Sequence, residues 1–412
     1  MKNSQSCRFC GMVLEHTFLD LGTSPLSNSY VKAESLGEME PFFPLYAFVC
    51  SACFLVQLKD CSSPERIFSD YAYFSSYSDV WLQHARVYTD MIQERMKLNE
   101  HSLVVEIASN DGYLLQYFLN KSIPVLGIEP AENVAKVAME KGIPTRIAFF
   151  GENSAQLLSR EGKQADLVIG NNVLAHVPDL NDFVRGLRIL LKPHGVITME
   201  FPHVMRLMEE NQFDTIYHEH FSYFSFCTVE KVFKRHGLIL FDVEELPTHG
   251  GSLRIYARHE ADQSKPVGPR VGALKDQEEK AGLTTLDCYL SFSKKVHHTK
   301  RQLLSFLIET KEKGKTIVGY GAPAKGNTLL NYCGIRTDFI DYTVDRSPHK
   351  QGLYLPGSHI PIEKPEAIRR TKPDYVFILP WNLKDEIMQQ MAFIREWGGA
   401  FVVPIPEVRV YQ

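Results

Sequence analysis

The sequence lacks long hydrophobic runs. None of its apolar stretches approaches the roughly 20 residues needed to cross a bilayer. The first residues also contain no apolar segment of the kind that directs secretion. These absences predict a cytoplasmic protein with no membrane partner.

An excess of charge of either sign is also lacking. The 412 residues include 45 Lys and Arg against 49 Asp and Glu, for a formal net charge of -4. Proteins that bind nucleic acid concentrate basic residues on one face, so we expect no nucleic-acid partner. Low-complexity segments are absent too, and the length predicts two or three globular domains, at about 100 to 200 residues each. We expect the protein to be a monomer.

Cysteine is sparse, but half of the eight cysteines form two C-x-x-C pairs. In a reducing compartment such thiols are free or bind metal more often than they form disulfides. Two pairs supply four thiolates, which complete a closed tetrahedral site, so we predict a structural Zn²⁺ ion. The 39 residues between the pairs and the lack of a basic helix argue against a DNA-reading finger. The predicted ligands are Cys7, Cys10, Cys50 and Cys53.

Alternating strand and helix patterns follow this N-terminal region, which we place at residues 1–64. The apolar, β-branched segments predict strands at 103–107, 124–129, 165–170 and 195–200, with 238–243 and 252–257 as a closing hairpin. Alternation of this kind indicates a doubly wound α/β sheet. We assign it to one domain, residues 65–262.

The turn after the first of these strands indicates a cofactor loop. Glu106 stands where a phosphate-binding loop would have glycine, and Asp111 adds a second negative charge. Such a loop repels a diphosphate but tolerates the sulfonium of an adenosyl group, and it resembles the opening motif of S-adenosylmethionine-dependent methyltransferases. Glu129 ends the next strand, where a carboxylate can accept hydrogen bonds from ribose hydroxyls. The predicted cofactor-binding residues are Glu106, Ser109, Asn110, Asp111, Gly112, Glu129, Phe149, Asn171 and Asn172.

A second Rossmann-like domain is predicted at 263–412. A charged amphipathic helix over 271–314 is predicted in its first part, and strands follow at 339–345, 375–379 and 400–403. Gly319, Gly321 and Ala324 satisfy the G-x-G-x-x-A fingerprint, and Asp345 ends a strand about 20 residues later. An NAD-dependent oxidoreductase acting on a nucleotide sugar is therefore an alternative function. The same backbone amides would hold the diphosphate of a sugar nucleotide equally well.

One segment, 216–225, gathers an unusual number of polar and aromatic side chains. Two imidazoles, a carboxylate and two phenols lie within seven residues. A histidine exchanges protons near neutral pH, and a neighbouring carboxylate can fix its tautomer. A loop of packed aromatics is the structural alternative. A His-Glu-His metal site is weaker, because adjacent side chains on one short loop diverge.

Together these segments resemble the sugar C-methyltransferase family, which methylates a carbon of nucleotide-linked 4-keto-deoxyhexoses. Matching segments occur in order along nearly the whole chain: the cysteine quartet, 70–82, 106–115, 217–223, 249–254 and 319–328. The resemblance implies an N-terminal zinc-binding domain, a class I methyltransferase fold that binds S-adenosylmethionine, and a C-terminal Rossmann-like domain that helps to bind the nucleotide sugar.

The resemblance also implies carbanion chemistry in branched deoxysugar biosynthesis. A base removes a proton beside the ketone, at carbon 3 or alternatively carbon 5, and the enolate takes the methyl group. The implied base is His220, with His218 as the alternative. Tyr217 and Glu219 would assist, and His176 and Tyr71 would stabilise the enolate oxygen. The implied substrate-binding residues are Tyr73, Tyr77, Trp81, His249, Gly321, Ala322, Lys325 and Asn327. A zinc-bearing scaffold without a ligand is the non-enzymatic alternative.

Overall fold

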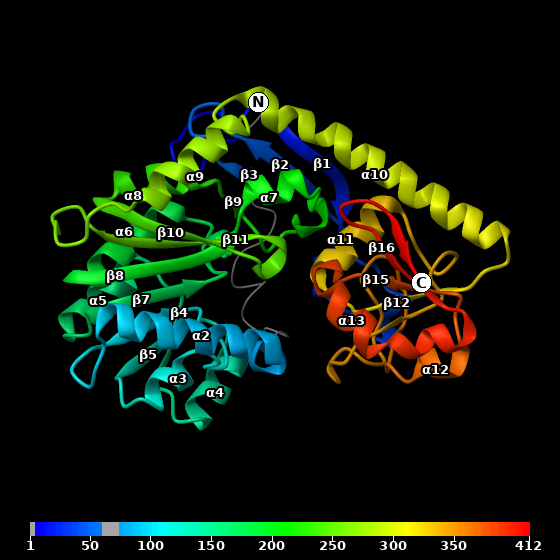
Figure 1. Cartoon of the computed structure of the whole chain (residues 1–412), viewed down its shortest axis with the longest axis horizontal. Coiled ribbons are helices and arrows are strands. Elements are labelled where there is room, and N and C mark those ends of the chain that lie inside the picture. The colour runs from blue at the N-terminus through cyan, green and yellow to red at the C-terminus, as the bar shows by residue number, and fades with distance from the viewer. Residues whose placement is uncertain (1–4, 60–73) are drawn as a thin grey trace. The chain divides into compact units, whose positions relative to one another are not determined.

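The computed structural model describes residues 5–59 and 74–412 (Figure 1). The chain divides into two compact units, and each is described by itself. Unit 1 contains Met1–Leu14, Cys50–His203 and Phe221–Thr284. Unit 2 contains Glu15–Val49, Val204–His220 and Thr285–Gln412. In the described residues no helix is long and apolar enough to span a membrane.

Unit 1 is built on a seven-stranded sheet with the order β10-β11-β8-β7-β4-β5-β6. All of its strands are parallel except β11, which runs antiparallel to both β8 and β10. This is the class I methyltransferase fold, so the predicted fold and its closing hairpin are confirmed. The strands are β4 Val104–Ile107, β5 Val125–Glu129, β6 Thr145–Ile147, β7 Ala165–Asn171, β8 Leu191–Pro202, β10 Leu238–Leu246 and β11 Ser252–His259.

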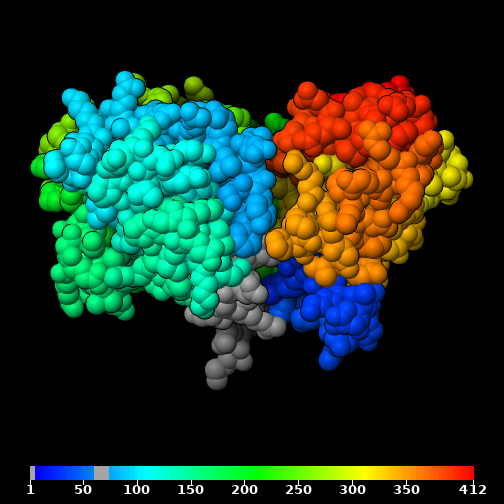
Figure 2. Space-filling view, turned by 90° about the horizontal axis from the view of Figure 1, so that it is seen from below, coloured from blue at the N-terminus to red at the C-terminus, as the bar shows by residue number. Residues whose placement is uncertain are grey.

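Helices cover this sheet, and three of them, α2, α3 and α4, pack on one face. Tyr88, Phe118 and Ala138 from these helices join Val104, Leu167 and other strand residues in one buried cluster. Figure 1 shows the three helices together, α2 in cyan and α3 and α4 in blue-green, and α2 is also on view at the surface in Figure 2. The helices of unit 1 are α2 Asp79–Met96, α3 Leu115–Leu119, α4 Glu132–Glu140, α5 Glu152–Arg160, α6 Leu180–Leu190, α8 Phe226–Arg235 and α9 Pro269–Lys280.

The sheet reverses its winding between β4 and β7. The chain leaves β4 toward β5 on one side, and returns to pair β7 with the other side of β4. Ligands of open α/β sheets bind at the carboxyl ends of strands at such a switch point. The topology therefore places the loops after β4 and β7 where a cofactor is expected. A short antiparallel pair, β3 Val56–Leu58 with β9 Ser222–Tyr223, completes the strands of unit 1.

Unit 2 contains a second Rossmann-like sheet with the order β14-β13-β12-β15-β16-β17. Its strands are parallel except the last, β17. They are β12 Ile317–Tyr320, β13 Thr343–Val344, β14 Ile362–Glu363, β15 Tyr375–Ile378, β16 Ala400–Val403 and β17 Arg409–Tyr411. The helices are α7 Val204–Glu209, α10 Leu286–Glu312, α11 Ala324–Cys333, α12 Ala367–Thr371 and α13 Lys384–Gln390.

An N-terminal segment belongs to the same unit. It forms an antiparallel pair, β1 His16–Ser24 with β2 Phe43–Val49, and Phe18 of β1 stacks on Phe292 of α10 with ring centroids 5.1 Å apart. The residues between the two strands reach the C-terminal sheet domain, because Val31 and Tyr354 form an antiparallel bridge. Figure 2 shows this segment, in blue, at the surface beside the orange part of unit 2.

Two predicted elements differ from the structure. The helix predicted over 271–314 is two helices, α9 and α10, because the chain breaks around Gly282, whose φ is +83°. The strand predicted over 339–345 is reduced to Thr343–Val344, because Phe339 and Ile340 donate their amides to the Arg336 carbonyl in a turn. The domain boundaries at 64/65 and 262/263 stay a prediction.

Candidate functional site

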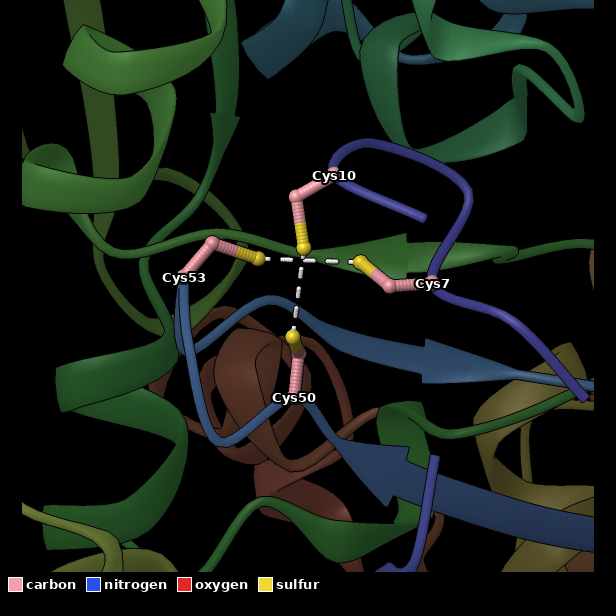
Figure 3. Close-up of side chains that lie close together, drawn as sticks. All are labelled: Cys7, Cys10, Cys50 and Cys53. Atoms are coloured by element: carbon pink, nitrogen blue, oxygen red, sulfur yellow. Dashed lines mark hydrogen bonds between the residues drawn. The ribbon is translucent and has the colours of Figure 1, made fainter. Parts of the chain in front are cut away.

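Four cysteine side chains in unit 1 converge on one point (Figure 3). Cys7 and Cys10 come from one tight turn, and Cys50 and Cys53 come from another. Their sulfur atoms all lie within 4.8 Å of one another, with Cys7–Cys53 at 3.6 Å and Cys10–Cys50 at 3.5 Å. Sulfurs about 2.3 Å from a tetrahedral Zn²⁺ lie about 3.8 Å from each other, so the four thiols fit this ion.

The surroundings of the cysteines support metal binding as well. The Gln57 amide donates a hydrogen bond to Cys7 Sγ at 3.2 Å, a contact of the kind that orients a metal ligand. Zinc binds cysteine in its thiolate form, and a hydrogen bond donated to the sulfur stabilises that form. All four positions are filled by protein ligands, so the site has a structural role.

The loop after β4 turns sharply beneath the predicted cofactor. Ala108, Asn110 and Gly112 all have positive φ, at 55°, 49° and 76°. A side chain at Gly112 would also collide with Ile143, whose Cδ1 would lie 2.2 Å from the added Cβ. Glycine is therefore required at this position by both backbone conformation and space.

Glu129 at the end of β5 closes back onto this loop. Its Oε2 accepts the Asn110 amide at 2.9 Å, and its Oε1 accepts the Ala131 amide at 2.9 Å. Each carboxylate oxygen has a second lone pair, so these bonds leave acceptor capacity for ribose hydroxyls. The geometry fits the role predicted for Glu129.

Buried polar atoms at the carboxyl ends of β4 and β7 call for a polar ligand. Ser109 Oγ, Asp111 Oδ1, Asn171 Nδ2 and Asn172 Oδ1 are buried and have no hydrogen-bond partner among the described residues. Buried polar atoms normally have partners, so a cofactor with hydroxyl, amino and carboxylate groups fits here. Phe149, another predicted cofactor residue, is partially exposed. It follows β6, the strand next to β5, which ends at Glu129.

Glu106 and Asp111 are the two acids from which a negatively charged loop was predicted. Glu106 is fully buried, and burial raises its pKa well above the usual range, helped by the charges of Glu129 and Asp111 and opposed by the side chain of Tyr113. Asp111 Oδ2 accepts from Ser76 Oγ and lies 3.3 Å from Lys141 Nζ. A cationic ligand would favour the ionised form of Glu106.

A second group of side chains lies around the predicted substrate residues Trp81 and His249. The Trp81 ring stacks on His84 at 4.9 Å and lies 5.3 Å from His249, measured between ring centroids. Asn172 Nδ2 donates to His249 Nε2 at 3.1 Å. The structure therefore connects these two predicted substrate residues with the predicted cofactor residue Asn172.

Sequence reasoning missed the residues that support this group. His84 Nε2 and Arg254 Nη2 lie 2.9 Å and 2.8 Å from Glu200 Oε2, which is completely buried. Glu200 ends a predicted strand and is the register partner of Asn171 on the neighbouring strand β7. An acid at the end of a buried strand, as at Glu129, is the signal that could have identified it.

The predicted catalytic residues are divided between the two units. Tyr217, Glu219 and His220 belong to unit 2, whereas His176, which ends the short 3₁₀ helix Leu174–His176 after β7, belongs to unit 1. Tyr71 and Tyr73 lie outside the described residues. Tyr77 in unit 1 is largely exposed and stacks on Phe74.

The two candidate histidines have different surroundings within unit 2. His220 is half-buried, its Nδ1 lies 3.0 Å from the Thr215 carbonyl, and its ring lies 4.1 Å from that of Tyr217. His218 is buried, and its Nε2 lies 3.2 Å from the Pro44 carbonyl. Burial lowers the pKa of His218.

Glu219 between them is buried and points to the N-terminal segment. Its Oε1 accepts from Asn28 Nδ2 at 2.5 Å. The nearby Tyr30 hydroxyl donates to the Ala322 carbonyl at 2.7 Å. The short segment with Asn28 and Tyr30 therefore contacts both the 217–220 loop and the glycine-rich loop that begins at Gly319. No motif in the sequence indicated Asn28 or Tyr30.

The glycine-rich loop has internal partners of its own. Asp345 Oδ2 accepts the Ala322 amide at 2.8 Å, as Glu129 accepts that of Asn110, and Lys350 Nζ donates to the Ala322 carbonyl at 2.9 Å. Gly321 has a φ of +88° and no space for a side chain beside Pro380. Asn327 is buried near the start of α11, and neither atom of its amide has a partner among the described residues.

Lys325 in the same loop lies against aromatic and polar neighbours. Its Nζ donates to Asn382 Oδ1 at 2.8 Å and lies 4.5 Å from the centroid of the Trp381 ring. Burial lowers its pKa, and the charge of Asp214 opposes this shift. The ammonium group thus has partners within unit 2 besides any ligand.

Comparison with known proteins assigns nearly the whole chain. Residues 7–68 match a putative zinc binding domain, 80–242 a methyltransferase domain and 247–406 a C-methyltransferase C-terminal domain. The chain is 37% identical to the C-methyltransferase NovU of Streptomyces niveus over 405 residues, which cover 98% of this chain and 96% of that protein. The chain belongs to the C-methyltransferase family.

Other relatives of this C-methyltransferase match only in part. A ubiquinone biosynthesis O-methyltransferase of Bartonella tribocorum is 24% identical over 95 residues, or 23% of this chain and 38% of that protein. The solved structure of PH0226 from Pyrococcus horikoshii has a TM-score of 0.36 at 19% identity, covering 47% of this chain and 97% of that one.

Family membership decides between the functions considered from the sequence. The cofactor is S-adenosylmethionine, and the cysteine quartet is the metal site of the zinc-binding domain. The fingerprint at Gly319–Ala324 lies inside the C-methyltransferase C-terminal domain. The dehydrogenase and scaffold alternatives are therefore not supported.

Proposed function

We propose that this C-methyltransferase acts on a nucleotide-linked 4-keto-deoxyhexose, and that His220 removes the proton from carbon 3 before methylation. The observation that carries the assignment of the base is the contact between His220 Nδ1 and the Thr215 carbonyl at 3.0 Å. The identity of the sugar and of the methylated carbon rests on the sequence resemblance.

The chemistry requires a base and a donor for the developing oxyanion. A proton on a carbon beside a ketone is acidic enough for a positioned imidazole to remove, and the electrons pass to the ketone oxygen. Bound S-adenosylmethionine supplies the electrophilic methyl group and departs as S-adenosylhomocysteine. His176 and Tyr71 are the proposed donors to the enolate oxygen, where an aimed donor is most effective.

The tautomer of His220 supports its role. A backbone carbonyl can only accept a hydrogen bond, so Nδ1 must carry the hydrogen and the basic lone pair belongs to Nε2. Tyr217 packs against the ring at 4.1 Å and limits its rotation. His218 instead has Nε2 as the nitrogen that donates, to Pro44, and burial lowers its pKa and so its basicity. These contacts favour His220 over His218.

Glu219 would orient the sugar rather than the imidazole. Its Oε1 is held by Asn28, and a buried carboxylate with further lone pairs can accept hydrogen bonds from a sugar hydroxyl. We include Asn28 as the residue that orients Glu219. Trp81, Tyr77, His249 and Tyr73 stay predicted substrate residues.

The start of α11 would bind the diphosphate of the substrate. Helix N-termini attract anions through their exposed amides, and Asn327 has an amide whose donors lack partners among the described residues. Gly321 and Ala322 would allow close approach of the backbone. A direct contact from Lys325 stays a prediction, since its ammonium group already reaches Asn382.

The test is to incubate the protein with S-adenosylmethionine and a panel of 4-keto sugar nucleotides in deuterated water. A mass gain of one methyl group on one panel member identifies the substrate, and the position of the methyl group by NMR distinguishes carbon 3 from carbon 5. Deuterium uptake without cofactor reports the base. His220→Gln should abolish both, whereas His218→Gln should retain uptake; methylation by His220→Gln at the wild-type rate would overturn the assignment.

A further inference from the structure

We propose that Asp214 is a positioning residue: held by Trp381 and Lys325, it fixes the Thr215 carbonyl that orients His220. The inference rests on the proposed role of His220 as the base. It concerns residues of unit 2 alone, and it extends the site to two residues, Asp214 and Trp381, that are not among the predicted substrate-binding or cofactor-binding residues.

Asp214 is fixed by contacts from two elements of the C-terminal sheet domain. It lies in the short 3₁₀ helix Phe213–Thr215, and its Oδ2 accepts from Trp381 Nε1 at 2.7 Å. The ammonium of Lys325 lies 4.5 Å from the centroid of the Trp381 ring and interacts with the Asp214 charge. Asp214 is completely buried, so its position is set by these partners and not by solvent.

Backbone hydrogen bonds connect the position of Asp214 with that of His220. Thr215 donates its amide to the Gln212 carbonyl and Ile216 donates its amide to the Phe213 carbonyl, which fixes the peptide groups on both sides of Asp214. The next carbonyl, that of Thr215, faces His220 Nδ1 at 3.0 Å. The carboxylate and the imidazole are thus connected through one rigid turn.

A carboxylate in this place also implies a single arrangement of the turn. Burial raises the pKa of Asp214 to about 6, while the charge of Lys325 and the hydrogen bond from Trp381 oppose the rise. The titratable groups that face it are Lys325 and Cys333, both on α11. An apolar side chain could pack in several ways, whereas the hydrogen bond from Trp381 Nε1 fixes the direction of Asp214 Oδ2. The other oxygen, Oδ1, is buried and has no hydrogen-bond partner among the described residues.

The decisive measurement is the tautomer of His220, read from the ¹⁵N chemical shifts of the full-length protein labelled at histidine. His220→Gln identifies the resonances that belong to this ring. We expect protonated Nδ1 and unprotonated Nε2 in the wild type, and a mixture of tautomers in Asp214→Ala. The opposite tautomer in the wild type, or an unchanged one in Asp214→Ala, would overturn the proposal.

Milder variants keep the test meaningful if Asp214→Ala does not fold. Asp214→Asn keeps an oxygen to accept from Trp381 but loses the charge facing Lys325, and Trp381→Phe keeps the ring but loses the donor. Both should lower kcat, by about tenfold or more for a displaced base, with less change in the Kd for S-adenosylmethionine. Asp341→Asn removes an exposed carboxylate of unit 2 that pairs with Lys311, and it should change neither the tautomer nor kcat.

The outcomes separate this inference from the proposed function. Loss of the tautomer preference together with loss of deuterium uptake by the substrate supports both. Loss of the preference with methylation at the wild-type rate supports the positioning role and rejects His220 as the base. A proportionate fall in cofactor affinity and kcat in all variants would indicate general destabilisation and reject the positioning role.

Discussion

His84 Nε2 lies within hydrogen-bond distance of both carboxylate oxygens of Glu200, at 3.0 and 2.9 Å. Arg254 Nη2 donates to the same carboxylate at 2.8 Å, and Thr248 Oγ1 donates at 2.9 Å. These partners lower the pKa of Glu200 although its burial acts to raise it. A buried, ionised acid therefore organises the strand ends beside Asn171 and supports the ring that stacks on Trp81.

Removal of this acid should destabilise unit 1. Glu200→Ala leaves the Arg254 guanidinium, which is 5% exposed, without its main counter-charge. Breaking a buried ion pair in this way costs about 3 to 5 kcal/mol, which urea unfolding of the full chain would measure. Glu132→Ala, which removes an exposed pair with Lys136, is the control and should change little. Equal effects of the two substitutions would contradict the role given to Glu200.

The cysteine quartet should hold one zinc ion per chain. Cys50→Ser removes a buried ligand, and because metal binding and folding are coupled, the variant should lose the metal and unfold at lower denaturant concentration. Elemental analysis measures the first effect and circular dichroism the second. Cys288→Ser, in α10 and away from the cluster, should keep the full zinc content. Retention of stoichiometric zinc by Cys50→Ser would exclude this cysteine as a ligand.

Gly112 and Gly142 offer a matched pair for the cofactor loop. Both have positive φ, at 76° and 80°, but an added Cβ would lie 2.2 Å from Ile143 Cδ1 at Gly112 and in open space at Gly142. Gly142→Ala should cost about 1 to 2 kcal/mol for the backbone alone. Gly112→Ala should cost more and weaken binding of S-adenosylmethionine, as thermal unfolding and calorimetry would show.

A double mutant separates crowding from backbone strain at Gly112. Ile143→Val removes the colliding Cδ1, so it should recover part of the stability lost in Gly112→Ala. The double mutant should therefore be more stable than the sum of the two single-mutant losses predicts. Additive losses would mean that crowding by Ile143 is not the cause.

The sequence predicted the fold of unit 1 well because its signals are local. The strand ending at Glu106 and Ile107, the acid Glu129 and the C-x-x-C pairs each combine a residue type with a fixed position on an element. Family membership then confirmed the cofactor and the methyl transfer. The helix predicted over 271–314 was wrong in its continuity, because a turn around Gly282 interrupts the amphipathic pattern.

What the sequence did not predict depends on contacts between distant segments. Asn28 meets Glu219 across 191 positions, and Trp381 meets Asp214 across 167. Periodicity and motif spacing carry no information about such pairs, since neither residue lies in a recognisable motif with its partner. The choice between His218 and His220 likewise depends on which carbonyl each ring faces.

The buried Glu106 makes a last prediction, on the pH dependence of cofactor binding. Its pKa is raised by burial, with Glu129 and Asp111 contributing in the same direction. The stability that comes from protonated Glu106 is thus complete below the pKa of an unfolded glutamate and is lost as pH rises through the raised folded value. A nearby cation instead lowers the pKa of Glu106, because it favours the ionised carboxylate. Binding of the positively charged S-adenosylmethionine should therefore release protons and become tighter as pH rises toward the raised pKa.

Calorimetry in two buffers with different enthalpies of ionisation measures the number of protons released. The wild type should release up to one proton per site at pH values between the ordinary glutamate pKa and the raised one, and none well above both. Glu106→Gln should release fewer protons and bind more weakly, with an affinity that depends less on pH, because no carboxylate remains to ionise at this position. Glu140→Gln, at the end of α4, removes a surface acid instead and should behave as the wild type. Proton uptake by the wild type, or the same release from Glu106→Gln, would show that another group senses the charge of the cofactor.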